Sequence, residues 1–189
     1  METLLGIFSA FGLSASAGLN AYIPLLVVGG LAHYTDLIKL QSPWDTLANP
    51  WILILLGILL IVEMLADKIP AVNHINDAIQ TFVRPTAGAI AFAASTNVIS
   101  GVNPVVALAC GLLVAGSVHV AKAAAVRPAV TAVSGGAANV PVSVAEDVVS
   151  TVVSLLAVVV PVVLGTLLII GLGFILWWWW RRSESNQTA

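Results

Sequence analysis

The stretch GLSASAGLNAYIPLL, Gly12–Leu26, joins two apolar ends through a small and polar middle, Ser14–Asn20. Within a bilayer, backbone that leaves the helix is tolerated only where other protein or a water-filled cavity surrounds it. The middle of this stretch therefore predicts an interruption between two short helices. Two forms stay open: a re-entrant turn inside the bilayer, or a tight surface loop in which Asn20 caps the following helix.

The composition of the whole chain points to a membrane. The 189 residues are 59% hydrophobic and 8% charged, with a mean hydropathy of +1.03. Soluble domains carry about 25% charged residues, so this chain is predicted to be one integral membrane domain over residues 1–189. The net charge of -2, without a basic stripe, excludes a nucleic acid partner. Cys110 is the only cysteine, so an intramolecular disulfide is excluded as well.

The apolar segments predict an all-α, polytopic transmembrane helical bundle with about six or seven membrane segments. They are residues 4–13, 19–32, 51–66, 87–94 with an extension toward 99, 105–121 and 148–180. As one helix the last segment would be about 50 Å long, against about 30 Å of hydrocarbon, so it must tilt, protrude or break. Pro161 and Gly165 mark the candidate break. Residues 181–189 form a short solvated tail.

Two polar connections set the predicted orientation. Residues 67–85 have apolar side chains at helical spacing, which predicts a short helix on the membrane surface; these are Val72, Ile75, Ile79, Phe82 and Val83. Residues 122–142 predict a long, weakly polar connection. Both connections carry Lys and Arg, so the positive-inside rule places them on the cytoplasmic side of the plasma membrane, with Lys39 opposite. The same rule favours two crossings in the last segment.

A short internal repeat suggests an inverted arrangement. Gly18-Leu19-Asn20 matches Gly101-Val102-Asn103 at an offset of 83 residues. Three segments separate equivalent points, so the two copies, within residues 1–85 and 86–180, would have opposite orientations, as in many secondary transporters. If both interruptions are re-entrant, a polar path would run between Asn20 and Asn103. If they are surface loops, each Asn is a helix cap.

Glu63 and Asp67 are the leading ionisable candidates for a site. They lie four residues apart at the end of an apolar segment, on one helix face, and an ionisable residue at membrane depth is a candidate for function. Two carboxylates so placed repel each other unless a proton or a cation lies nearby, and Lys68 or Arg84 could supply that charge. The alternative is a helix end whose acids face water. On the first interpretation, Glu63 and Asp67 lie at the cytoplasmic mouth of the predicted path.

A second group of candidates is cationic. Lys122 and Arg127 precede the glycine-containing stretch Ser134–Asn139, and together with Lys68 and Arg84 they could bind an anion or a phospholipid headgroup. The alternative is ordinary anchoring on the positive side of the membrane. Further on, the spacing from Ser143 to Glu146 predicts a capping box at the start of a helix.

The remaining residues give no sign of catalysis or of a cofactor. His33, His74 and His119 lack the spacing of metal ligands, and the chain contains no nucleophile elbow or phosphate loop. The sequence therefore predicts neither an enzyme nor a cofactor or metal. A lipid-modifying enzyme would require Glu63, His74 and Arg84 to converge in one cleft.

Three stretches resemble a bacterial membrane-protein family known as domain of unknown function 4126. They are GLSASAGLNAYIPLL, EMLADKIPAVNHINDAIQTFVRPTAGA and VSVAEDVVS, and the resemblance extends over most of residues 4–160. It implies a bacterial integral membrane protein, without an activity or a substrate. The positions that it marks are Gly18, Asn20, Glu63, Asp67, Lys68, Pro70, Arg84, Pro85, Gly88 and Glu146.

These observations lead to two hypotheses of different classes. The first is a small-solute or ion transporter, or a channel, that uses a polar path within an inverted repeat. The second is a membrane scaffold or partner-binding protein that transports nothing. A polar cavity that touches Asn20 or Asn103 would favour transport, and a dry packed centre would favour the scaffold. The predicted partners are the lipid bilayer and a small solute or ion, and a homo-oligomer stays open.

Overall fold

The computed structural model of the chain describes residues 2–96 and 102–185, and within these ranges it contains helices and no strand. The elements are α1 (Glu2–Leu19), α2 (Tyr22–Tyr34), η1 (Trp44–Ala48), α3 (Pro50–Ala66), α4 (Pro70–Thr96), α5 (Pro104–Ala121), η2 (Lys122–Val126), α6 (Arg127–Ser134) and α7 (Asn139–Ser185). The predicted all-α class is confirmed, and two predicted segments, 51–66 and 105–121, agree with α3 and α5 to within one residue.

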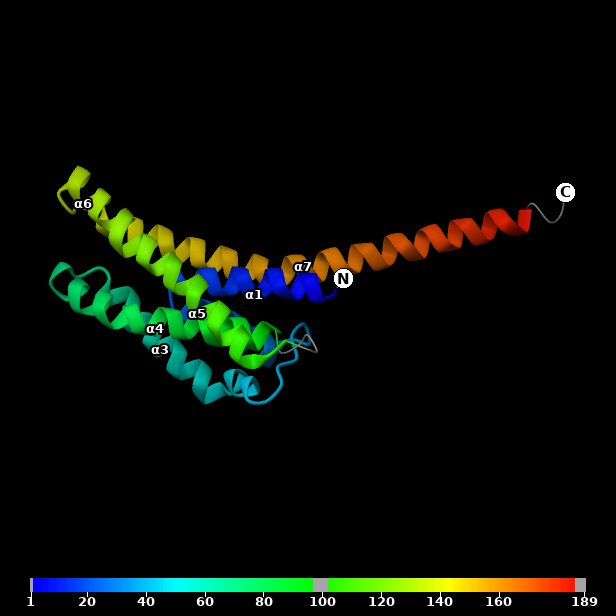
Figure 1. Cartoon of the computed structure of the whole chain (residues 1–189), viewed down its shortest axis with the longest axis horizontal. Helices are drawn as coiled ribbons and strands as arrows, with labels where there is room; N and C mark the ends of the chain where they lie inside the picture. The colour runs from blue at the N-terminus through cyan, green and yellow to red at the C-terminus, as the bar shows by residue number, and fades with distance from the viewer. Residues whose placement is uncertain (1, 97–101, 186–189) are drawn as a thin grey trace.

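The bundle is arranged around α1 (Figure 1). α1 packs against α4, α5 and α7, α4 packs against α5, and α2 lies against α3, η1 and α7. The α3–α4 link, the continuation of α5 into α6 and the start of α7 gather at one end of the bundle. We call it the polar end, because charged side chains of these elements meet there, namely Glu63, Asp67, Asp77, Arg84, Lys122, Arg127 and Glu146. The α2–α3 connection, which contains Lys39, lies at the opposite end.

Small residues allow the central helices to touch. A Cβ atom on Gly88 would lie 2.2 Å from Cβ of Ala115, and one on Gly111 would lie 2.4 Å from the Gly88 carbonyl oxygen. The Ser14 hydroxyl lies 2.8 Å from the Gly111 carbonyl oxygen and 3.2 Å from that of Gly88, so it donates to these two backbones. In a bilayer the hydrophobic effect does not drive helices together, because lipid tails are as apolar as the side chains. Close packing between small residues stabilises helix association there instead. The contact between α1, α4 and α5 is therefore packed and leaves no path at this level.

The interruption predicted over Ser14–Asn20 is wrong for most of its length. α1 stays helical to Leu19, and only two residues separate it from α2. The Ser16 hydroxyl lies 2.8 Å from the Ser150 carbonyl oxygen and 2.6 Å from Oγ of Ser154, both on α7. The serines and alanines of this stretch resemble a loop in composition, but they are the small contact surface that α1 presents to its neighbours.

Both asparagines of the repeat cap helices. The side-chain oxygen of Asn20 accepts from the Tyr22 N–H at 3.1 Å, and that of Asn103 accepts from the Val105 N–H at 2.9 Å. The predicted caps are thus confirmed, and the re-entrant form of the two turns stays a prediction. Gly101 lies outside the described residues, and the inverted repeat stays a prediction.

The predicted surface helix and the predicted segment from residue 87 form a single helix, α4, which contains Pro85. Proline removes one backbone hydrogen bond and usually kinks or ends a helix. Here the helix continues because α4 packs along α1 and α5, and because Arg84 is fixed in the polar end. The apolar face noted in the sequence points outward, since Ile75, Ile79 and Phe82 are 64%, 54% and 77% exposed.

The predicted connection 122–142 is mostly helical, because α5 continues through the π-helical turn η2 into α6. Its alanines favour a helix. α6 ends at Ser134 and is capped by Gly135, whose φ of 62° turns the chain, and the Ser134 hydroxyl accepts the Ala138 N–H at 3.2 Å. α7 then begins at Asn139, so the stretch from Ser143 to Glu146 lies inside a helix and the predicted capping box is wrong.

α7 runs without a break over 47 residues, or about 70 Å at 1.5 Å per residue. The hairpin considered at Pro161 is therefore wrong, and so are the two final crossings: α7 protrudes beyond the bundle, and its last turns lie far from the polar end (Figure 1). One explanation for the continuous helix is that its first half is held by the serine contacts to α1, while the apolar second half contains no polar turn that could reverse the chain.

Two helical stretches are long and apolar enough to cross a membrane, Pro104–Ser134 and Asn139–Pro161. Only 22% and 28% of their most apolar windows are buried, whereas the core helix of a soluble protein would be mostly buried. Large apolar side chains also face outward on other helices, with Trp51 on α3 78% exposed. These features support a membrane protein.

Candidate functional site at the polar end

The central feature of the polar end is a fully buried ion pair between α3 and α4. Nη2 and Nε of Arg84 donate to Oε1 of Glu63 at 2.9 and 3.2 Å. The side chains of Arg84 and Glu63 are 0% and 1% exposed. The second carboxylate oxygen of Glu63, Oε2, is buried and has no hydrogen-bond partner among the described residues. A carboxylate buried in this way keeps one oxygen available for a proton.

Asp67 connects four helical elements. It follows α3, and its Oδ2 lies 3.6 Å from Arg84, 3.8 Å from Lys122 and 3.0 Å from Arg127. Asn76 donates to its Oδ1 at 2.6 Å. Burial alone would raise the pKa of the Asp67 carboxyl, but Lys122, Arg127 and Arg84 oppose it, and the pKa falls below its ordinary value of 3.8. Asp67 is therefore ionised at neutral pH.

The π-helical turn η2 brings Lys122 and Arg127 to the same side. The Arg127 N–H bonds to the carbonyl oxygen of Lys122, five residues earlier. In an α-helix, side chains five residues apart would point about 140° away from each other. The wider turn reduces this angle, so both cations reach Oδ2 of Asp67.

Lys122 and Arg127 also bind carboxylates on other elements. Nζ of Lys122 lies 2.7 Å from Oε2 of Glu146 on α7 and donates to the carbonyl oxygen of Leu19, the last residue of α1, at 3.1 Å. Nη1 of Arg127 lies 2.7 Å from both carboxylate oxygens of Asp77 on α4. The cluster thus links α1, α3, α4, η2, α6 and α7.

His119 completes the buried network in its neutral form. Nη1 of Arg84 lies 3.3 Å from Nδ1 of His119, and because a guanidinium only donates, Nδ1 accepts. Nε2 therefore carries the proton and donates to Oγ1 of Thr81 at 3.2 Å. The Thr81 hydroxyl in turn donates to the Asp77 carbonyl oxygen at 2.8 Å, which is consistent with this direction.

Asn20 connects the end of α1 to α7. Nδ2 of Asn20 donates to Oδ1 of Asp147 at 2.9 Å, while Oδ2 of Asp147 is buried without a hydrogen-bond partner among the described residues. The carboxylates of this region, Glu63, Asp67, Asp77, Glu146 and Asp147, outnumber the cations Arg84, Lys122 and Arg127. The site is therefore suited to accept a proton or a small cation rather than an anion.

The structure brings together most of the residues proposed from the sequence. Glu63, Asp67, Arg84, Lys122 and Arg127 lie in one cluster. Asn20 lies beside it, since its neighbour Leu19 accepts from Lys122 and its own side chain binds Asp147.

Two proposed residues lie apart from this cluster. Asn103 is exposed and caps α5, and Lys68 is partly exposed and belongs to none of the ion pairs of the described chain. The cations of the proposed anion or headgroup site pair with carboxylates instead. A lipid-modifying enzyme would require His74 to converge with Glu63 and Arg84, but the side chain of His74 lies outside the described residues.

Four participants were not assigned to a site from the sequence: Asp77, His119, Glu146 and Asp147. One available signal was the polar face of α4, where Asn76, Gln80 and Arg84 recur every four residues opposite the exposed apolar face and are all buried. In a membrane protein, such a polar face points inward. Glu146 and Asp147 were attributed to a helix start, and only the earlier start of α7 places them in the cluster.

A metal centre of the usual kind is not formed by the described residues, since they contain no group of three or more His, Cys, Asp or Glu side chains that could hold a metal ion. The charges of the polar end are instead arranged in pairs of opposite sign, with unpartnered oxygens on Glu63 and Asp147.

Comparison with protein families identifies the chain. The model of a domain of unknown function, DUF4126, matches residues 7–182. The chain belongs to the DUF4126 family. The match confirms the resemblance found in the sequence, and the matched residues include the whole cluster of the polar end. Comparisons with curated proteins and with solved structures give no match.

Proposed function

We propose that this DUF4126 protein is a multi-pass transporter of the plasma membrane for a small solute or ion, and that the charge cluster is its cytoplasmic gate. The proposal rests on one observation: Glu63 is buried beside Arg84 with its Oε2 unpartnered. Removing two charges from water costs several kcal/mol for each ion, and an apolar pair of similar size usually stabilises a protein equally well. A chain that only needed a stable fold would gain nothing from this pair.

The gate follows from how α3 is held. α3 packs mainly on α2 and η1, and its outward residues Trp51, Ile61 and Leu65 are exposed. Its polar connection to the rest of the bundle is made at its end, by Glu63 and Asp67. Protonation of Glu63 would remove one of the two carboxylate charges that hold Arg84 of α4 to the end of α3, and would leave only the longer pair with Asp67 at 3.6 Å. The attachment of α3 to α4 would weaken, and water could enter between them.

Proton movement through proteoliposomes tests this function. Vesicles containing the purified protein and an internal pH-sensitive dye receive a potassium diffusion potential, and acidification of the interior is followed. The wild-type protein should acidify the vesicles faster than protein-free vesicles do, and Glu63→Gln should reduce the rate at least tenfold. Asp45→Asn is a matched control, because Asp45 is an exposed carboxylate in η1 at the opposite end. Wild-type vesicles no faster than empty ones would refute the proposal, as would an unchanged rate in Glu63→Gln.

A second function, a partner-binding scaffold, is favoured by the shape of α7 and by the packed contact of α1, α4 and α5. The far half of α7 extends past the bundle and is available to a second copy or another membrane protein (Figure 1). Energy transfer between copies labelled near the end of α7, together with no proton movement in any variant, would favour the scaffold over the transporter. Neither function includes catalysis, and we expect no enzymatic activity.

A further inference from the structure

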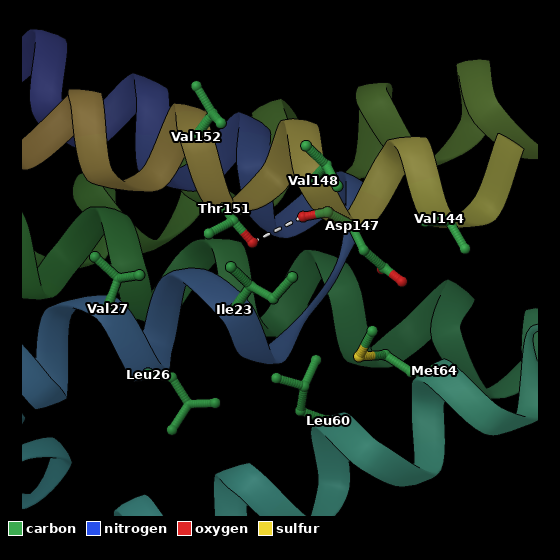
Figure 2. A pocket seen from close by; sticks show the side chains of 10 residues that line it. All are labelled: Ile23, Leu26, Val27, Leu60, Met64, Val144, Asp147, Val148, Thr151 and Val152. Atoms are coloured by element: carbon green, nitrogen blue, oxygen red, sulfur yellow. Dashed lines mark hydrogen bonds between the residues drawn. The ribbon is translucent and has the colours of Figure 1, made fainter. Parts of the chain in front are cut away.

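A cavity of about 500 Å³ lies between α2, α3 and α7, next to the charge cluster but separate from its ion pairs. Its wall is apolar and includes Ile23, Leu60, Met64 and Val148 (Figure 2). The volume lies within the range of about 300–1,000 Å³ that is typical of sites for small molecules. The cavity is open on one side, and because α3 and α7 present apolar side chains outward, that side would face lipid.

One acid interrupts the apolar wall. Figure 2 shows the Asp147 side chain pointing from α7 toward Met64 on α3. Asp147 is 6% exposed, and its Oδ1 accepts from Asn20 while Oδ2 has no hydrogen-bond partner among the described residues. Lys122, the cation bound to the neighbouring Glu146, is engaged at 2.7 Å. An unpaired carboxylate in apolar surroundings attracts a cation far more strongly than it would in water.

We propose that this cavity binds a cationic amphiphile, a molecule with one amine or quaternary centre and an apolar body, that enters from the bilayer. The apolar body would lie against Leu60, Met64 and Val148, and the cationic centre would lie against the Asp147 side chain, which lines the cavity. Charge complementarity decides between occupants: an anionic lipid would be repelled by Asp147, and a neutral acyl chain would leave its oxygen unpaired. The site uses neither residue of the gating ion pair, Glu63 and Arg84, and would exist in a protein that transports nothing.

Binding of tetraphenylphosphonium tests this site, because tetraphenylborate offers nearly the same shape with the opposite charge. Equilibrium binding of radiolabelled tetraphenylphosphonium is measured on the full chain in nanodiscs of neutral lipid, with binding to empty nanodiscs subtracted. The wild-type protein should bind it saturably, and should bind tetraphenylborate at least tenfold more weakly. Asp147→Asn should reduce the affinity for the cation at least tenfold, while its amide can still accept the Asn20 hydrogen bond.

Two further variants keep the test decisive. Met64→Trp fills the cavity from α3 without altering a charge, and it should also reduce binding at least tenfold, so the result does not depend on whether Asp147→Asn folds. Asp45→Asn, at the opposite end of the bundle, should bind as the wild type does. Equal affinity for the two tetraphenyl ions, or unchanged cation binding in both Asp147→Asn and Met64→Trp, would overturn the proposal and indicate a groove filled by lipid chains. Saturable cation binding without proton movement would refute the transporter and leave this site intact.

Discussion

Replacing Arg84 by methionine should destabilise the fold by about 3–5 kcal/mol, the usual cost of removing one partner from a buried ion pair. Methionine keeps an apolar stem but lacks the charge, and Arg84 provides both hydrogen bonds that the described structure gives to Glu63, at 2.9 and 3.2 Å. The carboxylate would then be buried at 1% exposure without compensation. Glu63→Leu alone should cost less, because Arg84 would keep Asp67 at 3.6 Å.

The double variant separates the ion pair from its packing. Glu63→Leu combined with Arg84→Met replaces a buried pair by apolar side chains, a change that is often neutral or stabilising by about 1–4 kcal/mol. Unfolding is measured in mild detergent by titration with sodium dodecyl sulfate and followed by circular dichroism. Lys39→Met, which removes an exposed cation at the opposite end, is the control. A loss below about 1 kcal/mol for Arg84→Met, or a double variant as unstable as the sum of the two single ones, would refute the reasoning.

Three further predictions concern packing, pH and topology. Gly88→Val should destabilise the protein by about 1–3 kcal/mol or more because its Cβ would meet a neighbouring helix at 2.2 Å, whereas Gly57→Val, with open space around it, should not; both are measured by the same titration. Folding lowers the pKa of Asp67, so the stabilisation by its charge should be complete above about pH 4 and disappear as the pH falls further. The stability difference between wild type and Asp67→Asn should therefore be constant from about pH 7 to 5 and shrink below about pH 4. A difference that stays constant at all pH values would contradict this prediction. In a cysteine-free background, Lys39→Cys and Lys68→Cys should react with a membrane-impermeant maleimide from opposite sides of the membrane, and labelling from one side only would exclude the proposed topology.

Long apolar helices were predictable because their signal is local. Residues 51–66 and 105–121 each begin just after an Asn-Pro pair, in which the asparagine caps the helix and proline occupies its first turn, and the structure places α3 and α5 there. The glutamate and aspartate at the end of α3 were also identified, because charge beside an apolar run is costly in lipid.

The errors arose where tertiary contacts override local preference. Ser14 and Ser16 look like loop residues, yet they donate to the backbones of other helices. Pro85 looks like a helix end, yet α4 is held on both sides of it. The pairing of Lys122 with Glu146 depends on a π-helical turn and on the start of α7 at Asn139, neither of which has a clear sequence signature.

The length of α7 gives small movements at the polar end a large reach. Its first turns carry the acids that bind Lys122 and Asn20, and the last serine contact to α1 is made at Ser154. From there to Arg181 the helix extends for about 40 Å as a lever arm. A pivot of about 5° at that serine would displace the far end of the helix by about 3.5 Å. A label on the C-terminal tail would therefore report a rearrangement that is too small to detect at the polar end.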